Sequence, residues 1–219
     1  MASIIFDKKI LIIGASGFGR EVLTCLIDNL GPSGKNIREI ACFMETKEFY
    51  QETQSIHGVP VIPDEQFDPL EYHVLVGIGE PSVRKKVVEG LPEETRFATL
   101  IHPSAIISEW VEIGEGSIIT AGTIATTDIV IGKHAQLNLH TTIGHDCQIG
   151  DYFTTAPGTN ISGLCQFGDC VYFGTNAATR QGIKICDHVT IGMGGVVVKH
   201  ISEPGIYIGN PAKKLERKK

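Results

Sequence analysis

A period of six residues runs through the second half of the chain and limits its fold more than any other feature. From Ile107 to Val197, every sixth residue gives sixteen positions, of which thirteen are large and apolar. Hydrophobic residues make up 42% of the whole chain, so about seven such positions would be expected without a repeat. The phase never slips, which predicts short strands of one length separated by equally short corners.

The positions beside this apolar column indicate how the strands are joined. Glycine often follows the apolar residue, where tight corners and close approaches favour a residue without a side chain. These glycines are Gly114, Gly132, Gly144, Gly150, Gly168, Gly174 and Gly192. The fifth position of each repeat is usually small or β-branched. Together the columns predict inward-pointing pairs in a stack of parallel strands, in which each repeat buries its neighbours.

The first hundred residues follow a different pattern. Short apolar runs at 9–13, 39–44 and 74–78 are expected strands, and the helical periodicity of 20–30 and 82–88 predicts two helices. Such alternation is typical of a small parallel α/β sheet. We therefore predict two domains, residues 1–100 and residues 101–219.

Composition argues against several classes of protein. The net charge is −6 with His neutral, which does not favour a nucleic-acid-binding surface. Apolar stretches fall short of the ~18 residues that a membrane-spanning helix needs, and residues 1–9 do not have the pattern of a signal peptide. The six cysteines include no C-x-x-C pair, so neither a metal site nor a disulfide framework is expected. A cytoplasmic protein is expected.

Six short motifs occur in a fixed order along the chain. They are residues 14–21 (GASGFGRE), 101–105 (IHPSA), 143–146 (IGHD), 156–158 (APG), 161–163 (ISG) and 209–213 (GNPAK). The ordered set resembles the hexapeptide-repeat sugar O- and N-acyltransferases, typified by the sialic-acid O-acetyltransferase and the bacillosamine N-acetyltransferase. The resemblance implies an N-terminal Rossmann-like nucleotide-sugar-binding domain and a C-terminal left-handed parallel β-helix that binds acetyl-CoA. It also implies a homotrimer with active sites between subunits.

The resemblance identifies His145 as the expected catalytic base. An attacking amine or hydroxyl must lose a proton, and imidazole is suited to accepting it near neutral pH. In the family, the carboxylate that matches Asp146 orients or polarises this ring. The resemblance implies coils of three hexapeptides, in which residues 18 apart share one column, so Gly163 should lie one coil from His145. The resemblance implies that the Gly163 amide binds the thioester carbonyl.

The acceptor is expected at a glycine-rich loop and on the β-helix. Gly14, Gly17 and Gly19 lie between a strand and a helix, where amide donors at the positive helix end suit a diphosphate. Their spacing differs from the dinucleotide fingerprint G-x-G-x-x-G, so a redox cofactor is not favoured. The full set of expected acceptor contacts is Gly14, Ser16, Gly17, Phe18, Gly19, Glu45, Glu80, Arg84, Asn138 and His140.

By the same resemblance, the coenzyme should lie along the later coils. Gly174, Gly192 and Gly194 would border the pantetheine, and Pro211 with Lys213 would lie near the adenine nucleotide. Thr154 belongs to this expected set because the family often carries a second histidine at its position.

The function expected from these features is acetyl transfer from acetyl-CoA to the amine of a nucleotide-linked amino-deoxysugar, of the 4-amino-4,6-dideoxyhexose type. O-acetylation of a sugar such as sialic acid is an alternative, because the same base and coenzyme groove would serve it. A non-catalytic scaffold that binds a nucleotide sugar is an alternative of another class.

Overall fold

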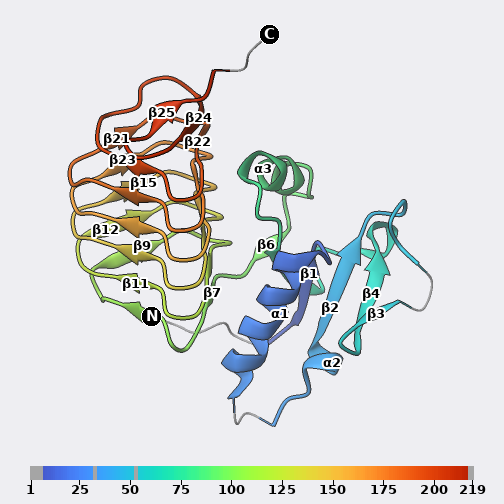
Figure 1. Cartoon of the computed structure of the whole chain (residues 1–219). Coiled ribbons are helices and arrows are strands. Elements are labelled where there is room, and N and C mark those ends of the chain that lie inside the picture. Colours follow the sequence, from blue (N-terminus) through green and yellow to red (C-terminus); the bar gives the residue numbers. More distant parts are fainter. Residues whose placement is uncertain (1–6, 32–33, 52–53, 217–219) are drawn as a thin grey trace.

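The chain folds into a small α/β part beside a tall parallel β-helix (Figure 1). The computed structural model describes residues 7–31, 34–51 and 54–216. The fold class predicted from the two sequence patterns is confirmed. No helix within these ranges is long and apolar enough to cross a membrane.

The N-terminal part is a six-stranded sheet with the order β3-β4-β2-β1-β5-β6. Its strands are β1 (Lys9–Ile13), β2 (Ala41–Glu45), β3 (Ser55–Ile56), β4 (Val59–Pro63), β5 (Tyr72–Val76) and β6 (Arg96–Phe97). All pair in parallel except β3 with β4. The helices are α1 (Gly17–Leu30), α2 (Ile37–Ile40) and α3 (Pro81–Glu89), with a 3-10 turn η2 (Asp64–Gln66).

The sequence of the central strand β1 is apolar at successive positions because both of its faces are buried. Ile10 and Ile12 belong to a core cluster that includes Val22 of α1, whereas Leu11 packs on the opposite face in a cluster that includes Val87 of α3. A parallel strand covered on both faces needs apolar residues at every position rather than alternating ones. Helix α1 ends after Leu30, where Gly31 takes a positive φ of 45°.

Three sheets form the walls of the β-helix. Sheet I contains β7 (Leu100–Ile101), β10 (Ile118–Ile119), β13 (Gln136–Leu137), β16 (Thr154–Thr155), β19 (Tyr172–Phe173), β22 (Val189–Ile191), β24 (Gly205–Ile208) and β25 (Lys213–Lys214). Sheet II contains β8 (Ile106–Ile107), β11 (Ile124–Ala125), β14 (Thr142–Ile143), β17 (Asn160–Ile161), β20 (Ala178–Thr179) and β23 (Val196–Val197). Sheet III contains β9 (Val111–Ile113), β12 (Ile129–Ile131), β15 (Gln148–Ile149), β18 (Gln166–Phe167) and β21 (Lys184–Ile185).

Residues 18 apart pair in neighbouring coils, as the resemblance implied. Leu137 pairs with Thr155 in sheet I, and Ile143 pairs with Ile161 in sheet II. The predicted apolar column points inward, where the rings of Phe153 and Phe167 stack with centroids 5.4 Å apart. The six cysteines are free thiols, and five of them are buried.

Three corners join the sheets, and each is named by its residues in one coil and their equivalents in the others. Corner A (138–141) joins sheets I and II, corner B (144–147) joins sheets II and III, and corner C (150–153) joins sheets III and I. The glycine column is needed for close approach between coils. A Cβ on Gly132 would lie 2.6 Å from the carbonyl carbon of Gly150 in the next coil.

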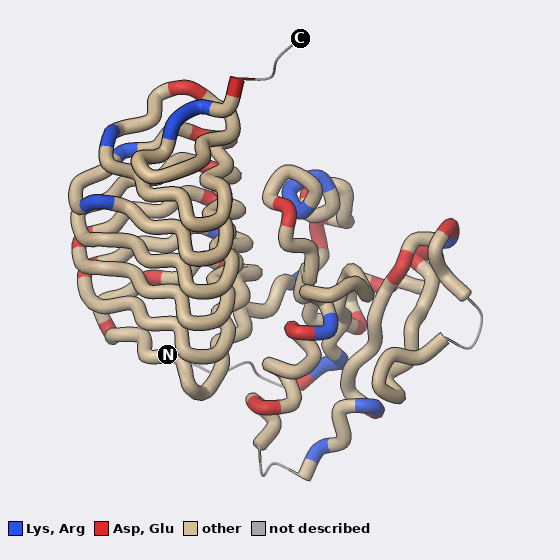
Figure 2. The backbone as a smooth tube through the Cα atoms, in the orientation of Figure 1, with Lys and Arg blue, Asp and Glu red and all other residues tan. Residues whose placement is uncertain are grey.

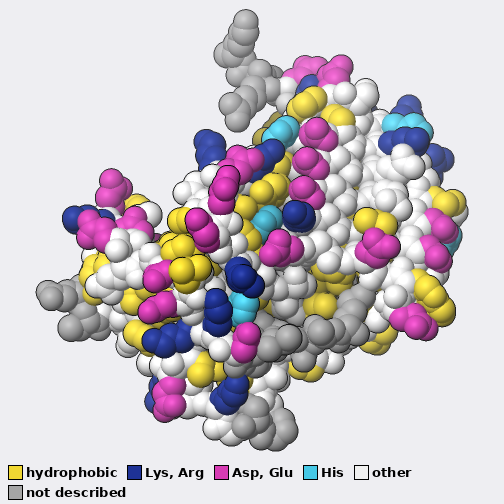
Figure 3. Space-filling model, turned by 180° about the vertical axis from the view of Figure 1, so that it is seen from behind, with side chains coloured by type: hydrophobic (Ala, Val, Ile, Leu, Met, Phe, Trp, Pro, Cys, Tyr) yellow, Lys and Arg dark blue, Asp and Glu magenta, His cyan; other side chains and the backbone are white. Residues whose placement is uncertain are grey.

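Aspartates form a ladder along corner C. Asp151, Asp169 and Asp187 each accept a hydrogen bond from a backbone amide one coil earlier, at 2.7, 2.8 and 2.9 Å. Seen from behind, acidic side chains form a row along the β-helix (Figure 3). Elsewhere Lys and Arg are spread over both parts among Asp and Glu (Figure 2).

The outward column of sheet I explains how the two parts meet. Leu100 and Ile118 pack into the core cluster of the N-terminal part. In the next two coils, Gln136 donates to the Val76 carbonyl at 2.7 Å and Thr154 donates to the Gly79 carbonyl at 3.2 Å. One coil later Tyr172 lines an open cleft. The contact therefore changes along one column from apolar packing to hydrogen bonds and then to open space.

Candidate active site

The His145–Asp146 pair lies at corner B. The His145 Nδ1 is 2.6 Å from the Asp146 Oδ2, and the two side chains are 50% and 51% exposed. Adjacent residues of a strand would point to opposite sides, but Asp146 has φ 59° and turns its side chain back onto the ring. With Asp146 ionised, Nδ1 carries the proton, so the lone pair of Nε2 is free to accept another.

Gly163 lies one coil above His145, as the 18-residue column predicts. A Cβ at Gly163 would lie 2.7 Å from the His145 Nε2 and 2.8 Å from its Cε1. The absent side chain therefore makes room for the imidazole. At corner C, aspartates cap the amides in the equivalent position, whereas within the described ranges the Gly163 amide has no acceptor. A free donor thus lies beside the ring.

A cleft of about 310 Å³ lies between the N-terminal part and sheet I. It brings together three of the predicted site residues, Phe18, Asn138 and Thr154. Its other lining residues are Glu21, Gly79, Gln136, Thr155, Ala156, Pro157, Tyr172 and Thr175. Aromatic, amide and hydroxyl groups on its walls suit a polar ligand with one flat group.

The glycine-rich loop divides into structural and free positions. Gly14 has φ 94°, and a Cβ on Gly19 would collide with the Gly14 carbonyl oxygen. The backbone conformation at Gly14 and the close packing at Gly19 therefore each require glycine. Among the described residues, nothing lies within 4 Å of a Cβ built on Gly17, and the Ser16 hydroxyl makes no capping hydrogen bond to α1. Gly17 and Ser16 are the loop positions left for a ligand.

Glu45 faces this loop rather than standing apart from it. The Ala15 amide donates to the Glu45 Oε1 at 2.7 Å. One of the loop amides predicted to bind a diphosphate therefore already donates to a carboxylate. Glu80 precedes α3 and is exposed. The pKa of Tyr172 is raised, mainly by burial of its hydroxyl and to a smaller extent by the Glu80 charge. Glu80 does not line the cleft, and its role in acceptor binding stays a prediction.

The prediction that Arg84 contacts the acceptor is wrong. Its side chain is 1% exposed and is fully engaged with protein oxygens, among them the carbonyls of His134 and Tyr152. The prediction for the Thr154 side chain also needs correction. The Thr154 hydroxyl accepts from Arg84 Nη2 at 2.8 Å and donates to Gly79, so it holds the two parts together and is not free for a coenzyme.

The remaining predicted residues lie along corner A and above it. Asn138 lines the cleft, and its Oδ1 accepts from the Leu139 amide at 2.7 Å, while its NH₂ has no partner in the part of the chain that the structure describes. His140 is exposed and its ring lies beneath Gly122. Gly174, Gly192 and Gly194 follow at the same corner in later coils. Pro211 and Lys213 are exposed beyond β24.

Sequence reasoning missed Tyr172, Glu21 and Thr175 as lining residues of the cleft. A signal for Tyr172 was present, because it follows Thr154 by 18 residues and so shares its outward column. Glu21 and Thr175 could not be found in this way, since their position depends on how α1 packs against the β-helix.

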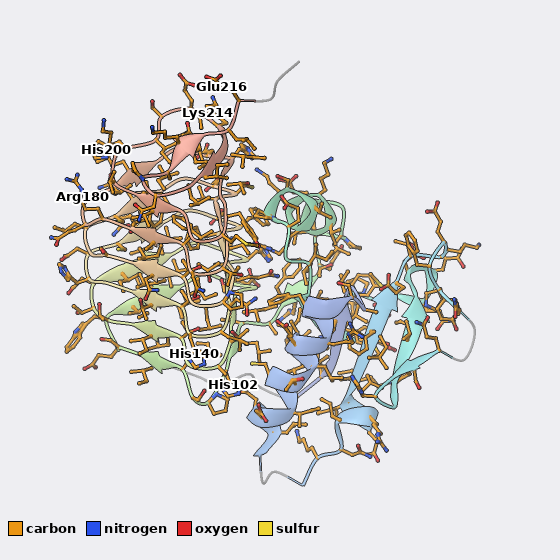
Figure 4. The ribbon with its side chains drawn as sticks, viewed as in Figure 1. His102, His140, Arg180, His200, Lys214 and Glu216 are labelled. Atoms are coloured by element: carbon orange, nitrogen blue, oxygen red, sulfur yellow. The ribbon has the colours of Figure 1, made fainter. Side chains whose placement is uncertain are left out.

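The His145 corner and the cleft do not coincide within one chain. The cleft lies on sheet I, whereas corner B lies across sheet II from corner A. Figure 4 shows Arg180 and His200, both at corner B in later coils, on the edge of the β-helix that points away from the N-terminal part. A larger open hollow of about 780 Å³ on sheet III is lined by Lys184 and His200 and contains none of the predicted site residues.

Comparison with known proteins agrees with both halves of the chain. Residues 9–91 match the family of the PglD N-terminal domain. A GDP-perosamine N-acetyltransferase from Escherichia coli O157:H7 is 29% identical, over 94% of this chain and 96% of that protein.

Solved structures resemble the whole chain. WeeI from Acinetobacter baumannii AYE is 30% identical with a TM-score of 0.86, and the match covers 94% of this chain and 99% of WeeI. PerB from Caulobacter crescentus, in complex with CoA and GDP-perosamine, is 27% identical with a TM-score of 0.82, over 98% of this chain and all of PerB.

Proposed function

The chain belongs to the hexapeptide-repeat sugar acyltransferases, and from this premise we propose that it acetylates the amine of a nucleotide-linked 4-amino-4,6-dideoxyhexose with acetyl-CoA. The observation that carries the proposal is the joint presence of a His–Asp pair on the β-helix and a polar cleft against the N-terminal part. Two similar proteins support the acceptor class, since one is named a GDP-perosamine N-acetyltransferase and the other binds GDP-perosamine.

The proposed chemistry is direct attack of the sugar amine on the thioester. As the C–N bond forms, His145 Nε2 accepts a proton from the amine, and Asp146 holds the Nδ1 proton in place. The carbonyl oxygen gains negative charge, which the Gly163 amide stabilises. The C–S bond then breaks and the CoA sulfur leaves, taking up the proton from His145. Atoms and charge balance without a metal.

The active site is completed by a second copy of the chain in this proposal. His145 at corner B and the cleft on sheet I lie on different edges of one β-helix. A cyclic homotrimer would bring corner B of one subunit to corner A and the cleft of the next. The coenzyme would lie in the groove between them, beside Gly174, Gly192 and Gly194, with Lys213 near its phosphates.

The acceptor would enter the cleft from the N-terminal part. Phe18 offers a face for the nucleotide base, and Ser16 and Gly17 offer polar groups near the start of α1. Asn138 would hold the sugar end close to corner A. We place the reaction in the cytoplasm, where both substrates would be available.

The experiment that tests the function is an assay with purified protein, acetyl-CoA and a panel of acceptors. The panel contains GDP-, UDP- and dTDP-linked 4-amino-4,6-dideoxyhexoses and free sialic acid, and thiol release is followed. Thiol release with an alkali-stable product supports N-acetylation, whereas an alkali-labile product would replace it with O-acetylation. Binding of nucleotide sugar without thiol release for any acceptor would favour the non-catalytic scaffold.

A further inference from the structure

A buried arginine joins the two parts of the molecule. Arg84 lies in α3, and its three nitrogens donate to seven oxygen atoms at 2.7 to 3.3 Å. The acceptors are the carbonyls of Ile78, Gly79, His134, Tyr152 and Phe153, the Gln136 side-chain oxygen and the Thr154 hydroxyl. All seven are neutral groups, so the guanidinium donates to no carboxylate within the described residues, and the Glu80 charge acts on it without a hydrogen bond.

Burial of the Arg84 guanidinium is unfavourable unless its hydrogen bonds are all made in one geometry. Taking a guanidinium out of water is unfavourable, and burial lowers the pKa of Arg84 to about 9. The planar fork offers five N–H groups in fixed directions. Two of the acceptors lie in the β5–α3 loop and five on the β-helix. The hydrogen bonds are satisfied together only when the loop sits at one place on the β-helix.

The same contacts reach the walls of the cleft. Gly79, Gln136 and Thr154 line it, and all three accept hydrogen bonds from Arg84. Two further bonds join the β-helix residues to this region: Gln136 donates to Val76 at the end of β5, and Thr154 donates to Gly79 in the loop. Three wall positions from both parts of the chain are thus fixed by one side chain that does not itself line the cleft.

We propose that Arg84 is a positioning residue that locks the β5–α3 loop onto the β-helix and holds the acceptor cleft in its binding shape before the acceptor arrives. The inference rests on the proposed function for the identity of the ligand. A cleft that is already formed costs the acceptor no binding energy for ordering its walls. Without the lock, only a fraction of molecules would hold the competent shape, and the apparent affinity would fall by that fraction.

The Arg84 contacts should affect binding of the acceptor and not binding of acetyl-CoA. The expected coenzyme positions Gly174, Gly192 and Gly194 lie at corner A in later coils, and none of them contacts Arg84. Loss of the lock should therefore weaken acceptor binding and leave acetyl-CoA binding intact. A residue needed for folding alone would change both constants or neither.

The test compares Arg84→Lys with Lys86→Met, which removes one positive charge from an exposed position of the same helix. A lysine ammonium has three donors at one point and cannot span the seven acceptors. In Arg84→Lys we expect the KM for the nucleotide sugar to rise ~10-fold or more, with the KM for acetyl-CoA and kcat within ~2-fold. Lys86→Met should match the wild type in all three.

Hydrogen–deuterium exchange supplies a readout that needs no turnover. In Arg84→Lys, amides of residues 76–80 should exchange faster than in Lys86→Met, with the coils of the β-helix unchanged. Unchanged exchange in this loop together with an unchanged acceptor KM would overturn the inference, whatever the melting temperature does. A wild-type protein inactive on all nucleotide amino-sugars would overturn the proposed function, and the exchange comparison would still decide the role of Arg84. Arg84→Met, which leaves the acceptors unpaired, should show the same effects more strongly if it folds.

Discussion

At the scale of single residues, the candidate catalytic imidazole is held from two directions. The Asp146 Oδ2 lies 2.6 Å from the ring Nδ1, and the space left by Gly163 lets the ring lie against the next coil. The first contact depends on a left-handed backbone at Asp146, and the second depends on the absence of a side chain 18 residues away. Each contact can be removed with a small substitution.

Replacing His145 by Asn should abolish most of the activity. Loss of a general base lowers turnover by ~10² to 10⁴, while Asn fits the exposed corner without a cavity. His188→Asn is the matched control, because His188 is exposed at corner C and lies in none of the proposed sites. Steady-state kinetics with saturating substrates measure the effect. Equal turnover for both variants would remove His145 from the role of base.

Gly163→Ala should lower turnover without unfolding the protein. The new Cβ would lie 2.7 to 3.0 Å from three atoms of the His145 ring, and an exposed ring can move away at small cost. We expect kcat to fall by ~10-fold or more because a catalytic group displaced by about 1 Å is poorly oriented. The melting temperature should stay within a few degrees of the wild type. A large loss of stability with normal kcat would mean that the ring does not move.

At the scale of elements, short contacts bind the N-terminal part to the base of the β-helix. The 101–105 motif has a physical explanation here. His102 Nε2 lies 2.8 Å from Asp28 Oδ2 of α1, while its Nδ1 accepts from the Ser104 amide at 3.0 Å. The linker histidine thus fastens α1 to the first coil, and Figure 4 shows it between them.

We predict that His134 makes the junction sensitive to acid. Its ring is 4% exposed and lies between Phe97 and Tyr152, with centroids 4.6 and 5.2 Å away. Burial, assisted by the nearby Arg84 charge, lowers its pKa from 6.5 to about 4. Between these values the unfolded chain binds the proton and the folded chain does not. The free energy of unfolding should therefore fall as the pH drops from about 6.5 to 4, by on the order of 3 kcal/mol from this group.

His134→Asn tests this dependence. Asn tolerates the left-handed φ of 54° at this position and cannot gain a proton. Urea unfolding at about pH 7 and pH 5 should show a smaller loss of stability on acidification than the wild type, even if the variant is less stable at both pH values through lost ring packing. Parallel losses in the two proteins would assign the acid sensitivity to other groups.

At the scale of the whole molecule, the separation of corner B from the cleft has a direct consequence. If each active site takes His145 from one subunit and the cleft from its neighbour, two defective chains can complement each other. His145→Asn removes the base, and Phe18→Asp places a carboxylate in the cleft at a first-turn position that a helix tolerates. Each variant alone should be inactive.

Refolding the two variants together in equal amounts should restore about a quarter of wild-type activity. In random trimers, half of the bases and half of the clefts are intact, and they meet in about one site in four. Mixing the folded variants without exchange of subunits is the control and should stay inactive. No recovery in refolded mixtures of confirmed trimers would show that each site is built from a single chain.

Much of the fold was predictable from the amino-acid sequence, because a strict repeat converts residue spacing into geometry. The six-residue period predicted a stack of short parallel strands, and the family resemblance supplied the coil of three hexapeptides. Together they placed Gly163 beside His145 and Thr154 below Tyr172. Within a solenoid, contacts between coils follow from residue number alone. The alternating strand and helix patterns of the first hundred residues likewise predicted a small parallel α/β sheet.

The contacts between the N-terminal part and the β-helix could be seen only in the three-dimensional structure. Arg84 looked like a ligand-binding residue because it follows a strand end, yet packing of α3 against sheet I buries it among carbonyls. Glu45 accepts a hydrogen bond from an amide of the glycine-rich loop, and Glu21 lines the cleft. No period relates one part of the chain to the other, so contacts across the junction depend on shape and hydrogen-bond satisfaction, which local sequence does not encode.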